Sequence, residues 1–248
     1  MTRPNPAIAV DQLVKVYKTA TAVDGISFAL ESGSITGLLG GNGAGKTTTI
    51  ATIMGLVIPT SGRVSVLGVD MARNRHRVLH RMNFESPYVE MPMRLTIRQN
   101  LTVFGMLYGC EDVPGRIATL AAELELTDLL DRPTGKLSAG QKTRVSLAKS
   151  LINEPEVLLL DEPTASLDPD TADWVRGRLE RYRAARGATV LLASHNMNEV
   201  ERLCDRVIML KRGRIEDDDT PSGLIARYGR SNLEEVFLDI ARGTGEAR

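Results

Sequence analysis

Residues 40–47 read GGNGAGKT and match the pattern G-x-x-x-x-G-K-[ST] at every fixed position. Residues 35–39 before them are predicted to form a strand, and residues 46–56 after them a helix. Glycines let the backbone wrap closely round a phosphate, and the following helix presents its positive end to the same anion. The order of strand, loop and helix therefore predicts a triphosphate-binding loop in an α/β domain, rather than a glycine-rich turn with a surface lysine.

The polar residues at the end of this phosphate loop predict how it would hold a nucleotide. Lys46 can neutralise the β- and γ-phosphates, and the Thr47 hydroxyl can serve as a ligand of Mg²⁺. Thr48 is placed to reach another phosphate oxygen. The candidate nucleotide-binding residues of the loop are Gly40, Gly41, Asn42, Gly43, Ala44, Gly45, Lys46, Thr47 and Thr48.

A second feature is the apolar run at residues 157–160, which ends in Asp161 and Glu162. The run is too short and too apolar for a surface helix, so we predict a buried parallel strand. Two adjacent carboxylates at the end of such a strand are costly without a cation, and a Mg²⁺ ion on the phosphates would offset that cost. Asp161 is then the candidate metal ligand and Glu162 the candidate general base for the attacking water. A strand that ends in solvated acids before a turn at Pro163 is the alternative.

A third feature opens a predicted helix at Ser138. Ser138 and Gln141 have the spacing of a capping box, and apolar residues follow at helical spacing. An ordinary capped helix is one interpretation. The other is that its small first residues let a phosphate approach the N–H groups of the helix N-terminus. Since the chain already has one phosphate loop, this second site makes most sense if it serves the nucleotide of another copy. Its candidate residues are Ser138, Ala139, Gly140 and Gln141.

Length and composition limit the remaining possibilities. The chain has 248 residues, with 31 Lys and Arg against 31 Asp and Glu, so net charge gives no sign of a nucleic-acid partner. Its two cysteines, Cys110 and Cys204, have no metal-ligand spacing and fit a reducing cytosol. The first residues lack the apolar segment of a signal peptide, and no run of about 18 apolar residues occurs. A membrane function would therefore need another chain for the membrane part.

The order of the predicted elements indicates one α/β domain with a helical insertion. We predict a core lobe of residues 1–87 and 154–225, a helical lobe of residues 88–153 and a C-terminal helical tail of residues 226–248. In the tail, Ser231 and Glu234 have capping-box spacing, and the helix is predicted to pack on its own core. The basic run at residues 73–77 is predicted to be a solvated helix face.

Together these motifs resemble those of the nucleotide-binding subunit of an ATP-binding-cassette (ABC) transporter, over about residues 8–238. Residues 40–48 resemble the Walker A loop, residues 157–162 the Walker B segment, and residues 137–141 the LSGGQ signature, with Ala139 in place of its first glycine. The resemblance implies a P-loop NTPase fold of ABC type, with a mixed β-core and an inserted α-helical subdomain. The site residues that it adds are Ser166, Leu167 and Asp168 as the D-loop, His195 as the switch histidine beside Glu162, and Tyr17 as the ring that stacks on adenine. For Tyr17, a partly buried strand aromatic is the alternative.

By the same resemblance, the chain is expected to be an ATPase that powers transport, in the direction of export, through a separate membrane permease. Two copies sandwich two ATP molecules with Mg²⁺, each ATP lying between the phosphate loop of one copy and the signature helix of the other. The expected partners are a second, identical subunit and integral membrane permease subunits, at the cytoplasmic face of the cell membrane, with no nucleic acid. Residues 95–101 and 233–238 resemble the corresponding segments of ABC-2 type exporters. One other hypothesis is a soluble ABC-type ATPase of DNA repair or translation. Another is a non-hydrolysing assembly scaffold, which the presence of Glu162 and His195 disfavours.

The sequence departs from the family pattern in two places. Members usually carry a glutamine at the junction between core and helical lobe, where it senses Mg²⁺ and the γ-phosphate, and none occurs at residues 81–88. An ungapped count places Pro87 there, and one or two extra residues would place Ser86 or Glu85 there instead. Gly41 replaces a common proline, and we expect this change to be tolerated because the side chain is not needed for phosphate binding.

Overall fold

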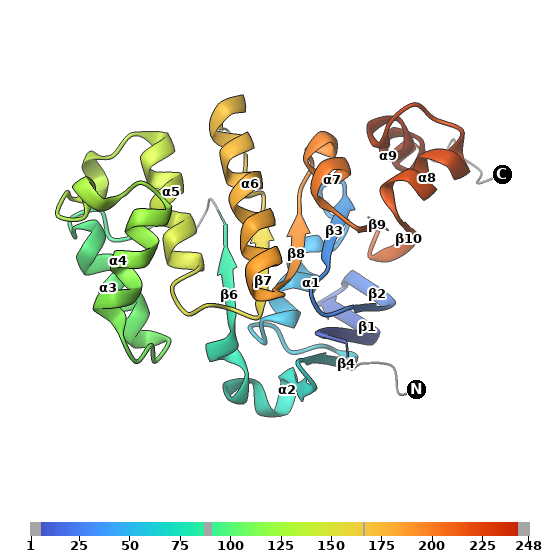
Figure 1. Cartoon of the computed structure of the whole chain (residues 1–248). Coiled ribbons are helices and arrows are strands. Elements are labelled where there is room, and N and C mark those ends of the chain that lie inside the picture. Colours follow the sequence, from blue (N-terminus) through green and yellow to red (C-terminus); the bar gives the residue numbers. More distant parts are fainter. Residues whose placement is uncertain (1–5, 87–90, 166, 243–248) are drawn as a thin grey trace.

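The computed structural model describes residues 6–86, 91–165 and 167–242, and the larger of its two sheets has six strands (Figure 1). In spatial order these are β10 (Arg214–Asp219), β9 (Arg206–Lys211), β3 (Ile35–Gly40), β8 (Thr189–Ala193), β7 (Val157–Asp161) and β6 (Met82–Glu85). The strands from β9 to β6 are parallel, and β10 is antiparallel to β9. Because parallel neighbours end at the same edge, the residues that follow β3, β7 and β8 meet there.

The smaller sheet is antiparallel and lies on the other side of helix α1 (Lys46–Ile53). Its strands, in spatial order, are β2 (Ala20–Leu30), β1 (Ile8–Tyr17), β4 (Ser61–Val66) and β5 (Val69–Asp70). Helix α1 contacts β3 of the larger sheet as well as β2 and β4 of the smaller one. The helix that follows the phosphate loop is therefore held between two sheets.

The remaining helices cover the far face and the two ends of the larger sheet (Figure 1). Helices α6 (Pro169–Arg186) and α7 (Met197–Leu203) lie over the far face. The β6 end carries α3 (Ile97–Leu107), α4 (Val113–Glu123) and α5 (Ala139–Ser150), and the β10 end carries α8 (Pro221–Tyr228) and α9 (Leu233–Arg242). Shorter elements are α2 (Met71–Asn74) and 3₁₀ turns at Arg75–Arg77, Leu79–Arg81, Thr127–Leu129 and Thr134–Lys136. Within the described ranges, no helix has the length and apolar character needed to cross a membrane.

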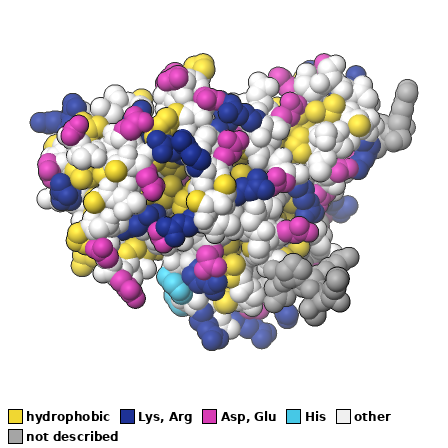
Figure 2. All heavy atoms as spheres, viewed as in Figure 1, with side chains coloured by type: hydrophobic (Ala, Val, Ile, Leu, Met, Phe, Trp, Pro, Cys, Tyr) yellow, Lys and Arg dark blue, Asp and Glu magenta, His cyan; other side chains and the backbone are white. Residues whose placement is uncertain are grey.

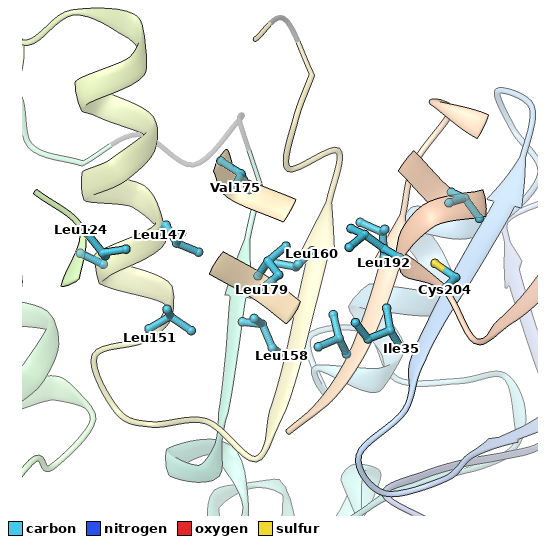
Figure 3. Packing of buried hydrophobic residues seen from close by; sticks show 14 of the residues in the cluster. Ile35, Leu124, Leu147, Leu151, Leu158, Leu160, Val175, Leu179, Leu192 and Cys204 are labelled. Carbon is cyan, nitrogen blue, oxygen red and sulfur yellow. The ribbon is translucent and has the colours of Figure 1, made fainter. Parts of the chain in front are cut away.

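The side chains of β7 alternate between two hydrophobic clusters, one on each face of the larger sheet. Leu158 and Leu160 point toward α6, where Figure 3 shows them beside Leu179. Val157 and Leu159 join the cluster on the side of α1. Burial on both faces explains the unbroken apolar run of this strand and confirms the predicted buried parallel strand.

Two strands of the larger sheet, β6 and β10, lack the apolar pattern that would identify a strand from the sequence. In β6, Asn83 and Glu85 interrupt the apolar residues that would indicate a strand. The Asn83 amide donates to Lys149 O at 3.2 Å and to Asn153 Oδ1 at 2.7 Å, so a segment far away in the chain supplies the partners that this strand needs. Strand β10 reads RIEDDD, and it lies at the edge of the sheet, where charged side chains reach solvent.

Two local predictions are wrong in detail. Residues 73–77 do not form one helix face, because α2 ends at Asn74 and 3₁₀ turns follow it. At the start of α9 the cap is Asn232, whose Oδ1 accepts from Glu235 N at 2.9 Å, in place of the predicted Ser231. Leu233, Val236 and Ile240 of α9 are buried in the hydrophobic cluster of the same chain, as predicted for this tail.

Candidate functional site

The phosphate loop joins the carboxyl end of β3 to the N-terminus of α1, as the sequence predicts. Its lysine folds back over the loop, where Lys46 Nζ donates to the carbonyl oxygen of Gly40 and, at 3.5 Å, to that of Gly41. Ala44 N donates to Gly41 O at 3.1 Å and closes the turn. The ammonium group is thus held beside the loop backbone, where a phosphate can take the place of the two carbonyls.

Gly45 is required at the end of this loop for two reasons. Its φ of +105° lies in a region that residues with a side chain rarely adopt. A Cβ there would also lie 2.6 Å from the carbonyl oxygen of Ala22 on β2. At Gly41, by contrast, a Cβ would meet nothing within 4 Å, which agrees with the expectation that this position tolerates different residues.

Asp161 and Glu162 lie where β7 ends beside β8. Asp161 is in register with Ala193, and Glu162 N donates to Ala193 O at 2.8 Å. Burial of the half-buried Asp161, together with the charge of Glu162, raises the pKa of the Asp161 carboxyl group. The positive charge of Lys46 opposes that rise, so the lysine of the phosphate loop lies close enough to act on the acid at the end of β7.

Glu162 and His195 form a direct pair at this edge of the sheet. His195 Nδ1 lies 2.5 Å from Glu162 Oε1, and the backbone N–H of His195 donates to Oε2 at 3.4 Å. The Glu162 side chain is 11% exposed and that of His195 is 70% exposed, so the ring lies on the solvent side of the carboxylate. Glu162 also has a φ of +56°, a strained conformation of the kind that concentrates at functional sites. Residues predicted from separate motifs are thus brought together.

Thr164, Ser194 and Glu199, which no sequence motif indicates, form a buried hydrogen-bonded group beside this pair. Glu199 Oε1 accepts from Thr164 Oγ1 at 2.9 Å, and Oε2 accepts from Ser194 Oγ at 2.7 Å. Burial raises the pKa of the Glu199 carboxyl group. The sequence signal that could have identified Glu199 is an acid in the first turn of α7, among the apolar residues Met197, Val200 and Leu203 that this helix buries.

The signature helix α5 begins as predicted, with a complete capping box. Ser138 Oγ accepts from Gln141 N at 3.2 Å, and Gln141 Oε1 accepts from Ser138 N at 3.1 Å. Ser138 and Ala139 are exposed, and a Cβ on Gly140 would lie 3.5 Å from Thr171 Oγ1 of α6. Among the residues that the structure describes, no hydrogen bond joins this helix start to the phosphate loop. Figure 1 shows α5 and α1 well apart, with β6 and β7 between them.

The predicted D-loop is described in part, because Ser166 lies outside the described residues. Leu167 N donates to Thr164 O at 3.2 Å, and Leu167 packs against the hydrophobic cluster. Asp168 caps α6, accepting from Thr171 N at 3.0 Å and from Thr171 Oγ1 at 2.7 Å. These hydrogen bonds lower the pKa of the Asp168 carboxyl group.

Tyr17 stands at the end of β1 and is 45% exposed, with Lys15 Nζ 4.9 Å from the centre of its ring. Its strand pairs with β2, and β2 borders the phosphate loop through the contact between Ala22 and Gly45. A ring with this exposure can stack on adenine. The same exposure also fits the alternative, an aromatic residue of a strand that is partly buried and has no role in binding.

Of the three candidates for the position of the family glutamine, Glu85 forms a buried ion pair. Glu85 Oε2 lies 2.8 Å from Lys149 Nζ of α5, and the Ser146 hydroxyl donates to Glu85 Oε1. Burial raises the pKa of the Glu85 carboxyl group, and Lys149 opposes that rise. Helix α5 therefore engages both oxygens of Glu85. Ser86 is buried, and Pro87 lies outside the described residues.

The oxygen atoms suited to Mg²⁺ are the Thr47 hydroxyl and the Asp161 carboxylate. Mg²⁺ keeps several waters and usually binds through one or two protein groups together with substrate phosphates. In the described part of the chain, no group of three or more His, Cys, Asp or Glu side chains could hold a metal ion by itself. The donors therefore fit a Mg²⁺ ion that arrives with a nucleotide.

Residues 23–165 match the family model of the ABC transporter, which covers more than half of the chain. The chain belongs to the ABC transporter family. This membership confirms the predicted family and the predicted ATPase class of enzyme. Among solved structures, the ATP binding subunit of an ABC transporter has a TM-score of 0.86 at 27% identity, covering 94% of this chain and 99% of that one. The predicted fold class is confirmed as well.

Relatives in this ABC family match nearly the whole chain. Nod factor export ATP-binding protein I of Paraburkholderia xenovorans (strain LB400) is 37% identical over 236 residues, which cover 94% of this chain and 77% of that protein. Daunorubicin resistance ATP-binding protein DrrA2 of Streptomyces coeruleorubidus is 39% identical over 240 residues, which cover 95% of this chain and 73% of that protein.

Proposed function

We propose that this chain binds ATP and hydrolyses it to drive transport through a separate membrane permease. The observation that carries the proposal is the Glu162–His195 pair, 2.5 Å apart, at the edge where the phosphate loop also begins. A carboxylate in this position can accept a proton from a water molecule that attacks a γ-phosphate. Membership of the ABC transporter family and the relatives named for export support the same function.

In the proposed reaction, the loop backbone and Lys46 bind the β- and γ-phosphates, and Tyr17 supports the adenine. Glu162 accepts a proton from the attacking water, whose oxygen bonds to the γ-phosphorus as the bond to the β,γ-bridging oxygen breaks, giving ADP and phosphate. His195 holds the Glu162 carboxylate and contacts the γ-phosphate. Thr47 and Asp161 hold Mg²⁺, which neutralises charge on the phosphates when it is bound.

The signature helix serves the nucleotide of a second copy in this proposal. Its start is exposed, capped and away from the phosphate loop of its own chain, so its free N–H groups face outward. Gly140 also lies close to Thr171, one turn after Asp168, and this proximity supports a shared role of the start of α5 and Asp168 in the dimer. The core lobe (residues 1–87 and 154–225) and the helical lobe (residues 88–153) would thus each contribute to both ATP sites of a dimer.

The proposed setting is the cytoplasmic face of the cell membrane, with the permease supplied by other subunits. The names of the relatives, Nod factor export and daunorubicin resistance, support export as the direction. The alternative of a soluble ATPase in DNA repair or translation has less support. On the face seen in Figure 2, basic and acidic side chains are intermixed, so that face offers no continuous basic surface for a nucleic acid.

The variant Glu162→Gln tests the hydrolytic role, because an amide keeps the shape of the carboxylate but does not accept a proton. We expect turnover of MgATP to fall by about 10²–10⁴-fold, with ATP binding kept and an ATP-bound dimer accumulating in size-exclusion chromatography. Glu216→Gln changes an exposed acid of β10 and is the matched control, with normal turnover expected. Normal turnover by Glu162→Gln would show that the general-base assignment is wrong.

Co-purification tests the partner. The tagged chain is expected to carry an integral membrane protein with it when it is isolated from detergent-solubilised cells. Binding of RNA or DNA in place of a membrane protein would contradict the transport function.

A further inference from the structure

Glu199 is a buried acid that lies close to the proposed catalytic pair without belonging to it. It is 1% exposed, and its carboxylate accepts hydrogen bonds from two hydroxyl groups on two different loops. One is Thr164, two residues after Glu162, at 2.9 Å; the other is Ser194, immediately before His195, at 2.7 Å. Each oxygen of the carboxylate therefore holds one of the segments that carry the pair.

Backbone hydrogen bonds complete this arrangement. Asn196 N donates to Ser194 Oγ at 3.0 Å, and Glu199 N donates to Asn196 Oδ1 at 3.3 Å. The start of α7 is thereby tied to the loop after β8. On the other loop, Ala165 N donates to Glu162 O at 3.0 Å, so the turn that carries Thr164 is closed on the catalytic residue itself. Both loops are internally bonded, and the Glu199 side chain adds a buried connection between them to the direct bonds of Glu162 with Ala193 and His195.

A carboxylate is an expensive way to hold two loops, because burial penalises the charged form. Burial does raise the pKa of the Glu199 carboxyl group, and nearby Glu162 adds to the rise, whereas the two hydroxyl donors and Arg176 oppose it. A leucine in this position would bury more apolar surface at no such cost. What the carboxylate supplies is two acceptor atoms a fixed distance apart, which an apolar side chain does not have.

The strain at Glu162 shows why such a connection matters. A φ of +56° is not a low-energy choice for a glutamate, so the surrounding structure must impose it. Two hydrogen bonds help to hold this conformation. One runs from Glu162 N to Ala193 O at 2.8 Å, and the other runs from the hydroxyl of Thr164, two residues later, to Glu199. Without the second, the turn after β7 is free to relax away from His195.

We propose that Glu199 is a positioning residue for ATP hydrolysis, which holds Glu162 and His195 in contact by fixing Thr164 and Ser194. This inference rests on the proposed roles of Glu162 and His195 and adds a residue that acts only through them. Glu199 is buried, and its carboxylate oxygens are occupied by Thr164 and Ser194. Its loss should therefore slow the chemical step and leave nucleotide binding as it is, because the phosphate loop does not depend on it.

The test uses the 248-residue chain with MgATP and four variants. Glu199→Ala removes both acceptors, and Thr164→Val and Ser194→Ala each remove one donor. We expect kcat to fall by about 10- to 100-fold for Glu199→Ala, the scale of a misplacement of about 1 Å at a catalytic group, with the Kd for ATP unchanged. The single-donor variants should lose less. Glu199→Gln should keep part of the activity, since its amide oxygen still accepts one hydroxyl and its NH₂ group can donate to the other hydroxyl oxygen.

Glu201→Ala is the matched control on the same helix. Glu201 accepts a hydrogen bond from Leu233 N and so holds α9, away from the catalytic pair. We expect this variant to lower Tm and leave kcat unchanged. It therefore separates a loss of catalytic geometry from a general loosening of α7.

The second readout is non-additivity. In the Glu162→Gln background, a further Glu199→Ala change should not reduce the residual single-turnover rate, because Glu199 acts through Glu162. Normal kcat in Glu199→Ala, or a fall in kcat with an equal loss of ATP affinity, would overturn the inference. If Glu199→Ala does not fold, normal kcat in both Thr164→Val and Ser194→Ala overturns it equally. Normal turnover by Glu162→Gln alone would instead overturn the proposed function.

Discussion

Glu85 and Lys149 form a buried ion pair, 2.8 Å from Oε2 to Nζ, which joins strand β6 to the signature helix α5. The Ser146 hydroxyl donates to the same carboxylate, and the Asn83 amide donates to Lys149 O at 3.2 Å. A buried ion pair adds little net stability compared with apolar residues of the same size, yet leaving one charge alone is costly. The pair therefore fixes how α5 sits on β6 more than it stabilises the fold.

Replacing one residue of this pair should lower the free energy of unfolding more than replacing both residues. We expect Lys149→Met to lower the free energy of unfolding by about 3–5 kcal/mol, because it leaves the Glu85 carboxylate buried and unpaired. The double variant Glu85→Leu, Lys149→Met should recover most of that loss. Urea unfolding measures each variant. Arg98→Met, which breaks the exposed Arg98–Asp131 pair, is the control and should cost less than about 1 kcal/mol. Additive losses in the double variant would contradict this account.

Ser138→Arg should separate the role of the signature helix from binding of the chain's own ATP. The bulky cation would occupy the space in front of the helix N-terminus, and we expect turnover to fall by about 10²-fold or more, the scale of losing a group that stabilises transition-state charge. Equilibrium binding of ATP to the isolated chain should not change.

Ser138→Ala is the matched comparison for this experiment. It removes the cap, at a cost of about 1 kcal/mol of stability, but leaves the approach to the helix open. Its turnover should therefore exceed that of Ser138→Arg. Loss of ATP binding by the isolated Ser138→Arg chain would mean that the motif is structural.

Removal of Mg²⁺ should abolish turnover, and its return should restore it. We expect Thr47→Val to raise the Mg²⁺ concentration at half-maximal rate by about tenfold, equivalent to roughly 1.4 kcal/mol of binding free energy. Thr49→Val is the control, because the Thr49 hydroxyl is buried and donates to Gly45 O at 2.9 Å. It should lower Tm without changing the Mg²⁺ requirement. An equal Mg²⁺ requirement in wild type and Thr47→Val would remove Thr47 from the metal site.

The cap of α6 should make stability depend on pH. The pKa of Asp168 is lowered in the folded chain by hydrogen bonds from Thr171, so the folded state binds fewer protons than the unfolded state. The resulting stability is present above the unfolded pKa, about 3.9, and is lost as pH falls through the lower folded pKa. Asp168→Asn keeps a capping oxygen but does not titrate. Wild type should therefore exceed Asp168→Asn in unfolding free energy at neutral pH, and the difference should shrink below about pH 4. A difference that stays constant with pH would show that the charge of Asp168 plays no part.

Much of the site could be predicted because its devices are local. The phosphate loop, the capping box of Ser138 and Gln141, and the cap at Asp168 each depend on backbone conformations and hydrogen bonds within a few residues. The residue types that each of them needs stand at neighbouring positions of the chain, so a short sequence pattern identifies them. The buried strand β7 could be predicted for a similar reason, since burial on both faces demands an unbroken apolar run.

Local patterns therefore specify the separate parts of the site: a phosphate loop, two strand-end acids, a capped helix and a histidine after a strand. The fold brings these parts together. Glu162 and His195 are 33 residues apart in the chain and come to 2.5 Å because β7 and β8 pair in one register. The positions of Glu199 and of the Glu85–Lys149 pair depend on the same long-range packing. Register and packing are set by contacts between distant segments, and no local pattern of residues specifies those contacts.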